Sequence, residues 1–124
     1  MFNPITIPAD AKMLYNVVKL KEGITMDDVE LTVGQMCHVV KETYPGFIAG
    51  QVFRFAGFVS DAGSIDSSKE TEDHIAIITY WKSFEEHEES HANEIFKTHF
   101  DELVEMSKEA YEIGYELLWQ GEPE

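Results

Sequence analysis

Three histidines fall within one stretch of the chain that is otherwise rich in glutamate. His87, His91 and His99 all lie between Ser83 and Met106. An imidazole can exchange a proton near neutral pH, and it is also a common ligand of transition metals. The segment that carries these histidines is therefore the part of the sequence best equipped for acid–base chemistry or for metal binding.

His87 and His91 have the spacing of a two-histidine metal site. Residues four apart on a helix lie on the same face, so both imidazoles could reach one cation. A stable site would need a third protein ligand from another part of the chain, and the sequence indicates none. Since pairs at this spacing often arise by chance, we predict that the chain binds no metal ion.

The elements that must position these histidines follow a β-α-β-β-α-β order. Alternating apolar residues indicate strands, while apolar residues at helical spacing, preceded by capping residues, indicate helices. The strands are expected at about Met13–Glu22, Phe47–Val59, His74–Lys82 and Tyr115–Gln120, and the helices at about Met26–Tyr44 and Phe84–Tyr111. We predict a ferredoxin-like α+β fold, in which a four-stranded antiparallel sheet carries both helices on one face.

The chain has the size and composition of one globular domain. It contains 124 residues, and 44% of them are hydrophobic. We expect the domain to span residues 13–121, after an N-terminal arm (1–12) with two prolines and before a short tail (122–124). The polar stretch 60–73 between the second and third strands is expected to be a long loop.

The charge balance excludes two classes of partner. The chain has 24 acidic and 9 basic residues, which gives a net charge of −15. Nucleic-acid binding depends on Lys and Arg, and an anionic membrane would repel this chain, so we expect neither partner. Cys37 is the only cysteine and cannot form an internal disulfide. Because the start of the chain also lacks the features of a signal peptide, we expect a cytoplasmic protein.

Both faces of the predicted strands are apolar. In the second strand, Phe53 and Phe55 fall on one face, and Val52 and Phe58 fall on the other. Two helices can cover only one face of a sheet, and soluble monomers rarely expose a large apolar patch. We therefore predict a homodimer in which the subunits pack sheet against sheet.

The segment Thr79-Tyr80-Trp81-Lys82-Ser83, with a capped helix after it and His91 early in that helix, resembles a known family. It is similar to the dimeric α/β-barrel superfamily, and in particular to its antibiotic-biosynthesis-monooxygenase group, over about Met13–Gln120. Some members are cofactor-free oxygenases that act on aromatic polyketides. The resemblance therefore implies a monooxygenase-like protein that needs no cofactor.

Other members of this superfamily degrade haem, and the resemblance extends to part of their site. In that subgroup an Asn on the first strand, a Trp on the third strand and a His on the second helix form the site. Asn16 and Trp81 correspond to the first two. The haem-ligating position falls on Phe100, with His99 one residue short, and one residue is about 100° of helix rotation.

One face of each predicted element points to a common interior. Advancing about 100° per residue from Phe84 places His91 and Ile95 on the inward stripe of the helix. We predict an apolar pocket between the helices and the sheet, lined by Leu14, Asn16, Val18, Trp81, Phe84, His87, His91, Ile95 and Phe96. His91, Asn16 and Trp81 are the candidate catalytic residues, as the few polar groups of this pocket. Each has a structural alternative: packing for His91 and Trp81, and a satisfied buried amide for Asn16.

A mostly apolar pocket with sparse polar groups is typical of a site for a flat or elongated small molecule. We therefore predict a small-molecule-binding homodimer whose ligand resembles a fatty acid, polyketide or terpenoid. A cofactor-free monooxygenase is the enzymatic form of this hypothesis. The alternative is a haem-binding or haem-degrading monooxygenase.

Overall fold

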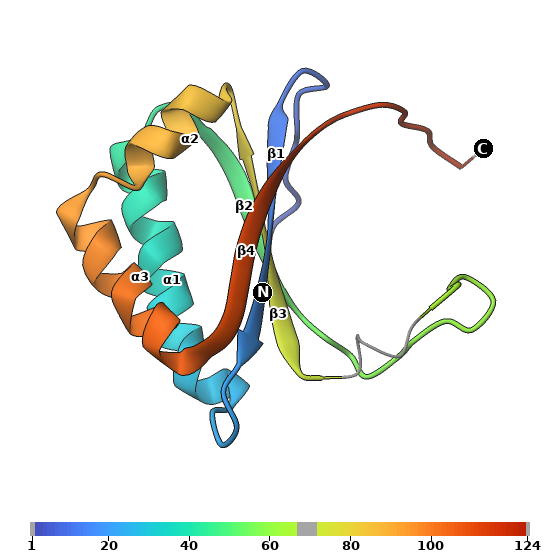
Figure 1. Cartoon of the computed structure of the whole chain (residues 1–124). Coiled ribbons are helices and arrows are strands. Elements are labelled where there is room, and N and C mark those ends of the chain that lie inside the picture. The colour runs from blue at the N-terminus through green and yellow to red at the C-terminus, as the bar shows by residue number, and fades with distance from the viewer. Residues whose placement is uncertain (1, 67–71, 124) are drawn as a thin grey trace.

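A computed structural model describes residues 2–66 and 72–123 and contains one antiparallel sheet with helices on one face (Figure 1). The four strands are ordered β2-β3-β1-β4 across the sheet. The elements are β1 (Lys12–Leu20), α1 (Met26–Thr43), β2 (Phe47–Arg54), β3 (His74–Trp81), α2 (Phe84–Ser90), α3 (Glu94–Met106) and β4 (Ser107–Glu116). This arrangement confirms the predicted ferredoxin-like α+β fold. Among the described residues, no helix combines the length and the apolar character that crossing a bilayer would require.

The central strand β1 brings distant parts of the chain together. It pairs antiparallel with β3 on one side and with β4 on the other. Asn16, in the middle of β1, lies opposite Ile77 of β3 and Glu112 of β4. The middle of the sheet therefore aligns residues that are about a hundred positions apart in the sequence.

Helix α1 forms where the sequence predicts it, because its first turn is capped and one of its faces is apolar. The backbone N–H of Thr25 donates to Oδ2 of Asp28 at 2.8 Å, as in a capping box. The residues that α1 buries against the sheet recur at helical spacing, and they are Val29, Val33, Met36 and Val40. Packing of this apolar face holds α1 over the sheet.

The prediction of one continuous helix over Phe84–Tyr111 is wrong, because the chain breaks the helix at Asn93. Asn93 has extended backbone angles, and its side chain accepts a hydrogen bond from the N–H of Phe96 at 2.9 Å. Asparagine favours such an N-cap over a helix interior, since its side chain competes for backbone hydrogen bonds. α2 therefore ends at Ser90, and α3 starts again at Glu94 in a new direction (Figure 1).

The last strand also begins earlier than predicted. α3 ends at Met106, and β4 occupies Ser107–Glu116 instead of Tyr115–Gln120. From Ala110 onward the residues alternate between the two faces of the sheet, as β geometry requires. The shift moves Glu112 from the connection between the predicted helix and the predicted strand into the sheet.

The second strand is shorter than expected, and no helix of the described residues covers the opposite face of the sheet. β2 ends at Arg54 instead of Val59. The predicted loop 60–73 is described except for residues 67–71, which lie outside the described part of the chain. In Figure 1 the segment after β2 and the C-terminal tail both extend on the side of the sheet away from the helices. That face retains half-exposed apolar side chains, among them Phe53, Ile113 and Tyr115.

Candidate functional site

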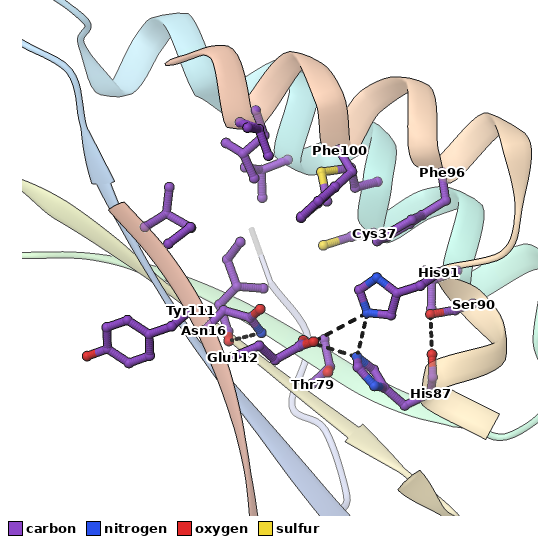
Figure 2. Close-up of a pocket in the computed structure, with 18 of the residues that line it drawn as sticks. Asn16, Cys37, Thr79, His87, Ser90, His91, Phe96, Phe100, Tyr111 and Glu112 are labelled. Carbon is purple, nitrogen blue, oxygen red and sulfur yellow. Dashed lines mark hydrogen bonds and ion pairs between the residues drawn. The ribbon is translucent and has the colours of Figure 1, made fainter. Parts of the chain in front are cut away.

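A cavity of about 270 Å³ lies between the helices and the inner face of the sheet (Figure 2). Most of its wall is apolar. α3 contributes Phe96, Phe100 and Leu103, and the rings of Phe96 and Phe100 stack with centroids 6.1 Å apart. α1 contributes Met36 and the thiol side chain of Cys37. Such a wall favours an apolar ligand.

The polar groups of the cavity gather where α2 faces β1, β3 and β4. Figure 2 shows His87 and His91 of α2 directed toward Glu112, with Asn16 and Thr79 on the sheet beside them. Because the rest of the wall offers little hydrogen bonding, a ligand with one polar end would be held with that end toward the histidines.

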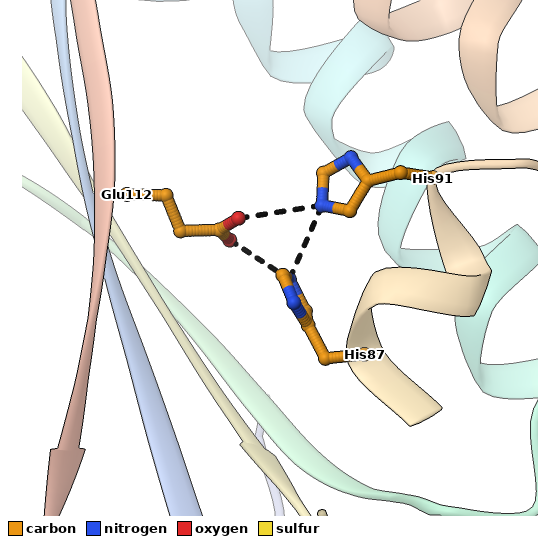
Figure 3. Close-up of side chains that lie close together, drawn as sticks. All are labelled: His87, His91 and Glu112. Atoms are coloured by element: carbon orange, nitrogen blue, oxygen red, sulfur yellow. Dashed lines mark hydrogen bonds and ion pairs between the residues drawn. The ribbon is translucent and has the colours of Figure 1, made fainter. Parts of the chain in front are cut away.

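The centre of this polar region is a compact cluster of His87, His91 and Glu112 (Figure 3). Oε2 of Glu112 lies 3.0 Å from Nε2 of His87, and Oε1 lies 3.3 Å from Nε2 of His91. The two Nε2 atoms are 3.3 Å apart. Three side chains from two elements therefore direct their polar atoms at one point, which we call the histidine–glutamate triad.

The triad changes the proton affinity of its members. Burial disfavours the charged form of Glu112, but hydrogen bonds and opposite charges from His87 and His91 outweigh it and lower the pKa of Glu112 to about 2. The hydrogen bond with Glu112 raises the pKa of His91, against the opposing effect of partial burial. Glu112 is therefore an anion throughout the neutral range, and His91 is a better proton acceptor than a free imidazole.

His87 is the most buried member of the triad and is held on several sides. It is 4% exposed, its ring packs edge-on against Trp81, and its Nδ1 lies 3.2 Å from Oε1 of Glu88. The hydroxyl of Ser90 donates to the carbonyl of His87 at 2.6 Å. His91, by contrast, has a side chain that is one third exposed, and it is the C-cap residue that follows α2. His91 is thus the histidine that a ligand in the cavity can reach more easily.

Asn16 and Trp81 both line the cavity, but their polar atoms already have protein partners. Nδ2 of Asn16 donates to the carbonyl of Ile77 at 3.1 Å. Nε1 of Trp81 donates to the hydroxyl of Thr79 at 3.0 Å, and only 1% of Trp81 is exposed. The geometry therefore favours a packing role for Trp81, whereas the amide of Asn16 remains at the polar end of the cavity.

The structure gathers six of the nine predicted pocket residues around the cavity: Asn16, Val18, Trp81, His87, His91 and Phe96. Leu14 and Phe84 belong to the packing around the core instead. Ile95 is 62% exposed, which contradicts its predicted place on the inward stripe. That prediction assumed an unbroken helix, and the break at Asn93 changes the rotation of every residue after it.

The sequence does not predict Glu112 as a site residue, because the predicted helix ends at Tyr111 and the predicted strand begins at Tyr115. Residue 112 then falls in the connection between these two elements. A signal was present: between residues 110 and 115, small or polar residues alternate with Tyr111, Ile113 and Tyr115. This period of two is typical of a strand. It would have placed Glu112 on the inner face.

The haem alternative gains no support from His99. Phe100 lines the cavity, whereas His99 lies at a second, shallow groove between α1 and α3. The residues present at the expected ligand position therefore do not fit a haem iron.

No protein-family model matches the chain, and no curated protein sequence is significantly similar to it. Solved structures share its fold. The oxygenase SnoaB from Streptomyces nogalater, described as cofactor-independent, is 15% identical with a TM-score of 0.64, covering 94% of this chain and all of SnoaB. A dimeric ferredoxin-like protein of unknown function from Thermobifida fusca is 10% identical with a TM-score of 0.65, covering 94% of this chain and all of that chain. A hydroxynitrile lyase from Passiflora edulis is 9% identical with a TM-score of 0.61, with the same coverage.

These similarities confirm the predicted ferredoxin-like fold. At such low identity the shared fold does not define the reaction, and an oxygenase and a lyase both appear among the similar structures. The function must therefore be argued from the side chains of this chain.

Proposed function

We propose that the protein is a small-molecule oxygenase of the monooxygenase type, which binds a flat, mostly apolar substrate between its helices and sheet. One observation carries this proposal: the cavity is apolar except at one end, where Asn16 and the histidine–glutamate triad meet. A substrate with one oxygen-bearing end would place that oxygen against His91 and Asn16. The fold shared with SnoaB supports this reading.

The polar end suits a substrate that becomes an oxyanion. Removal of a proton from a phenol or from the acidic CH₂ group of an enolisable ketone leaves negative charge on oxygen, and polar donors or cations aimed at that oxygen stabilise the charge. The resulting electron-rich carbon can react with O₂. When a CH₂ group becomes a carbonyl, one oxygen atom enters the substrate and the other leaves as water, and the substrate supplies all four electrons. Such a reaction needs no external reductant.

We infer that the working unit is a homodimer formed through the helix-free face of the sheet. Phe53, Ile113 and Tyr115 on that face are 44–48% exposed, and apolar side chains at this density favour burial against a second apolar surface. Tyr115 packs edge-on against Tyr15, so the patch is continuous across β1 and β4. A second copy that offers the same patch would cover it symmetrically.

Oxygen consumption with an anthrone, a flat phenolic ketone with an acidic CH₂ group, tests the proposed activity. We expect uptake above the rate of the protein-free solution, and a loss of about 10²-fold in His91→Ala and Asn16→Ala if both stabilise the oxyanion. His38→Ala is the matched control, because His38 lies outside the cavity. Equal uptake with and without the protein would refute the oxygenase proposal.

Native mass spectrometry of freshly purified protein tests the binding step separately. The expected result is a dimer that carries an apolar small molecule. Phe100→Trp would fill the apolar part of the cavity and should release that molecule without affecting the dimer. A ligand retained equally by Phe100→Trp would show that binding occurs elsewhere.

A further inference from the structure

The sequence predicts no metal ion because it indicates no third ligand, but Glu112 fills that role in the structure. We propose that His87, His91 and Glu112 bind one divalent transition-metal ion, such as Zn²⁺ or Fe²⁺, at the polar end of the cavity. This inference deepens the proposed function, because such an ion would face the substrate oxygen. It shares the cavity with that proposal but rests on the geometry of the triad alone.

The separations between the polar atoms of the triad are close to those between the ligand atoms of a bound metal ion. Bonds of about 2.0–2.1 Å place the ligand atoms of a tetrahedral zinc site about 3.3 Å apart. Here the two Nε2 atoms are 3.3 Å apart, Oε2 of Glu112 lies 3.0 Å from Nε2 of His87, and Oε1 lies 3.3 Å from Nε2 of His91 (Figure 3). Both carboxylate oxygens therefore face the space between the imidazoles, and one of them or both could bind the ion. Each contact taken alone fits a hydrogen bond, but each Nε2 carries at most one proton, so two N–H groups can serve only two of the three contacts at once. One cation at the centre accounts for all three contacts.

The contact between Nδ1 of His87 and Glu88 also supports a metal site. Histidine ligands commonly donate their second ring N–H to a carboxylate, which fixes the tautomer and leaves the other nitrogen free to bind the metal. Nδ1 of His87 lies 3.2 Å from Oε1 of Glu88, and Nε2 is the atom that points into the triad. A neutral imidazole has a single N–H, so with Nδ1 donating to Glu88, Nε2 presents a lone pair to the proposed ion.

The donor set selects the class of ion. Two imidazoles and one carboxylate suit Zn²⁺, Fe²⁺ and related first-row ions, whereas Mg²⁺ and Ca²⁺ prefer sites made of oxygen. Three protein ligands also leave at least one position open, as catalytic sites do and structural zinc sites do not. Because the triad lines the cavity, that position faces the bound substrate.

The charge of the site indicates which substrates it would hold. A divalent ion with one glutamate has a net charge of +1, so an enolate or phenolate oxygen in the open position would make the site neutral. The ion would then add to the stabilisation of this oxyanion. Substrates with such an oxygen should bind more tightly to the metal-loaded protein than to the stripped protein.

Titration of the chelator-stripped full chain with zinc sulfate in a calorimeter tests this inference. We expect binding of one Zn²⁺ per chain and a rise in the melting temperature that grows with zinc concentration. His91→Ala and Glu112→Gln should each weaken zinc binding at least about tenfold. His38 lies outside the triad, so the control variant His38→Ala should bind zinc as the unmodified chain does. His91 is partly exposed at the end of α2, so its replacement should leave the fold intact, which circular dichroism can verify.

Cobalt(II) provides a second readout that does not depend on activity. Visible absorption bands typical of four- or five-coordinate Co²⁺ should appear with the unmodified chain and disappear in Glu112→Gln. Absence of zinc binding, or equal binding by all variants, would overturn the metal site and leave the oxygenase proposal untouched, because the anthrone assay needs no added metal. Conversely, zinc binding with no oxygen uptake would refute only the oxygenase proposal.

Discussion

Glu112 and Ile113 are neighbours in β4, yet they serve opposite faces of the sheet. Glu112 points inward, where two histidines surround its carboxylate at 3.0–3.3 Å. Ile113 points outward and is 44% exposed. The inner face thus places the charge of Glu112 among partners that balance it, whereas Ile113 on the outer face lies in a patch of apolar side chains that includes Phe53 and Tyr115. A charged side chain is therefore stabilised at position 112, whereas it would be destabilising at position 113.

Placing a charge on the outer face should have the largest effect. Ile113→Glu would bury two unpaired carboxylates in the proposed symmetric dimer interface, at a cost of several kcal/mol. We expect dimer dissociation to increase by at least about 100-fold, measured by sedimentation velocity over a range of concentrations.

Leu31→Glu is the matched control for that experiment. Leu31 is a strongly exposed apolar residue on α1, away from the sheet, so its replacement should leave the dimer intact. If Ile113→Glu sediments as the unmodified chain does, the interface does not lie on the helix-free face.

Removing the charge from the inner face should change how stability depends on pH. In metal-free protein, the lowered pKa of Glu112 adds stability above about pH 4.5 that is lost as the pH falls toward 2, on the order of 3 kcal/mol. The raised pKa of His91 adds stability below about pH 6.5 that is lost as the pH rises through its folded-state value. The triad, with Glu88 beside it, should therefore be most stabilising between these limits.

Melting temperatures of chelator-treated protein between pH 3 and 9 measure this effect. Glu112→Gln keeps the shape of the side chain but removes its charge, so its profile should be flatter than that of the unmodified chain. Parallel profiles for the two proteins would mean that the triad contributes little to pH-dependent stability.

The next residue of β4 offers a smaller and purely steric test of the inner face. A Cβ atom at Gly114 would lie 2.6 Å from Cε1 of Phe84, so Gly114→Ala forces that ring to move. We expect a loss of about 1–3 kcal/mol in the free energy of unfolding, measured by urea denaturation. Phe84→Leu should recover part of this loss in the double variant, and purely additive effects would argue against the contact.

Much of the fold could be predicted, because local sequence patterns identify several of its helices and strands. α1 has a capping box and a regular apolar face, β1 alternates, and β3 is an unbroken run of strand-forming residues, so their predicted bounds differ from the structure by two residues or fewer. The break at Asn93 could not be predicted in the same way. Ser83 and Asn93 are both competent caps, and apolar spacing continues on either side of the break, so only packing against α1 and the sheet decides between one helix and two.

The site was harder to predict than the fold, because its third member comes from another element. The spacing of His87 and His91 is visible in the sequence, and the inward position of His91 follows from it. The partner Glu112 depends on where β4 starts, and an error of eight residues there removed it from consideration. Long-range pairing of β4 with β1 fixes that start, and no local pattern encodes it fully.

Cys37 has a practical consequence beyond its place in the cavity wall. It is the only thiol of the chain, and burial raises its pKa, so it reacts slowly at neutral pH. Its rate of alkylation consequently reports how often the space between α1 and α3 opens to solvent, and an occupant of that space would slow the reaction further. Alkylation of Cys37 can therefore measure how often the cavity is occupied, because the mass of the single adduct is detected without any engineered label.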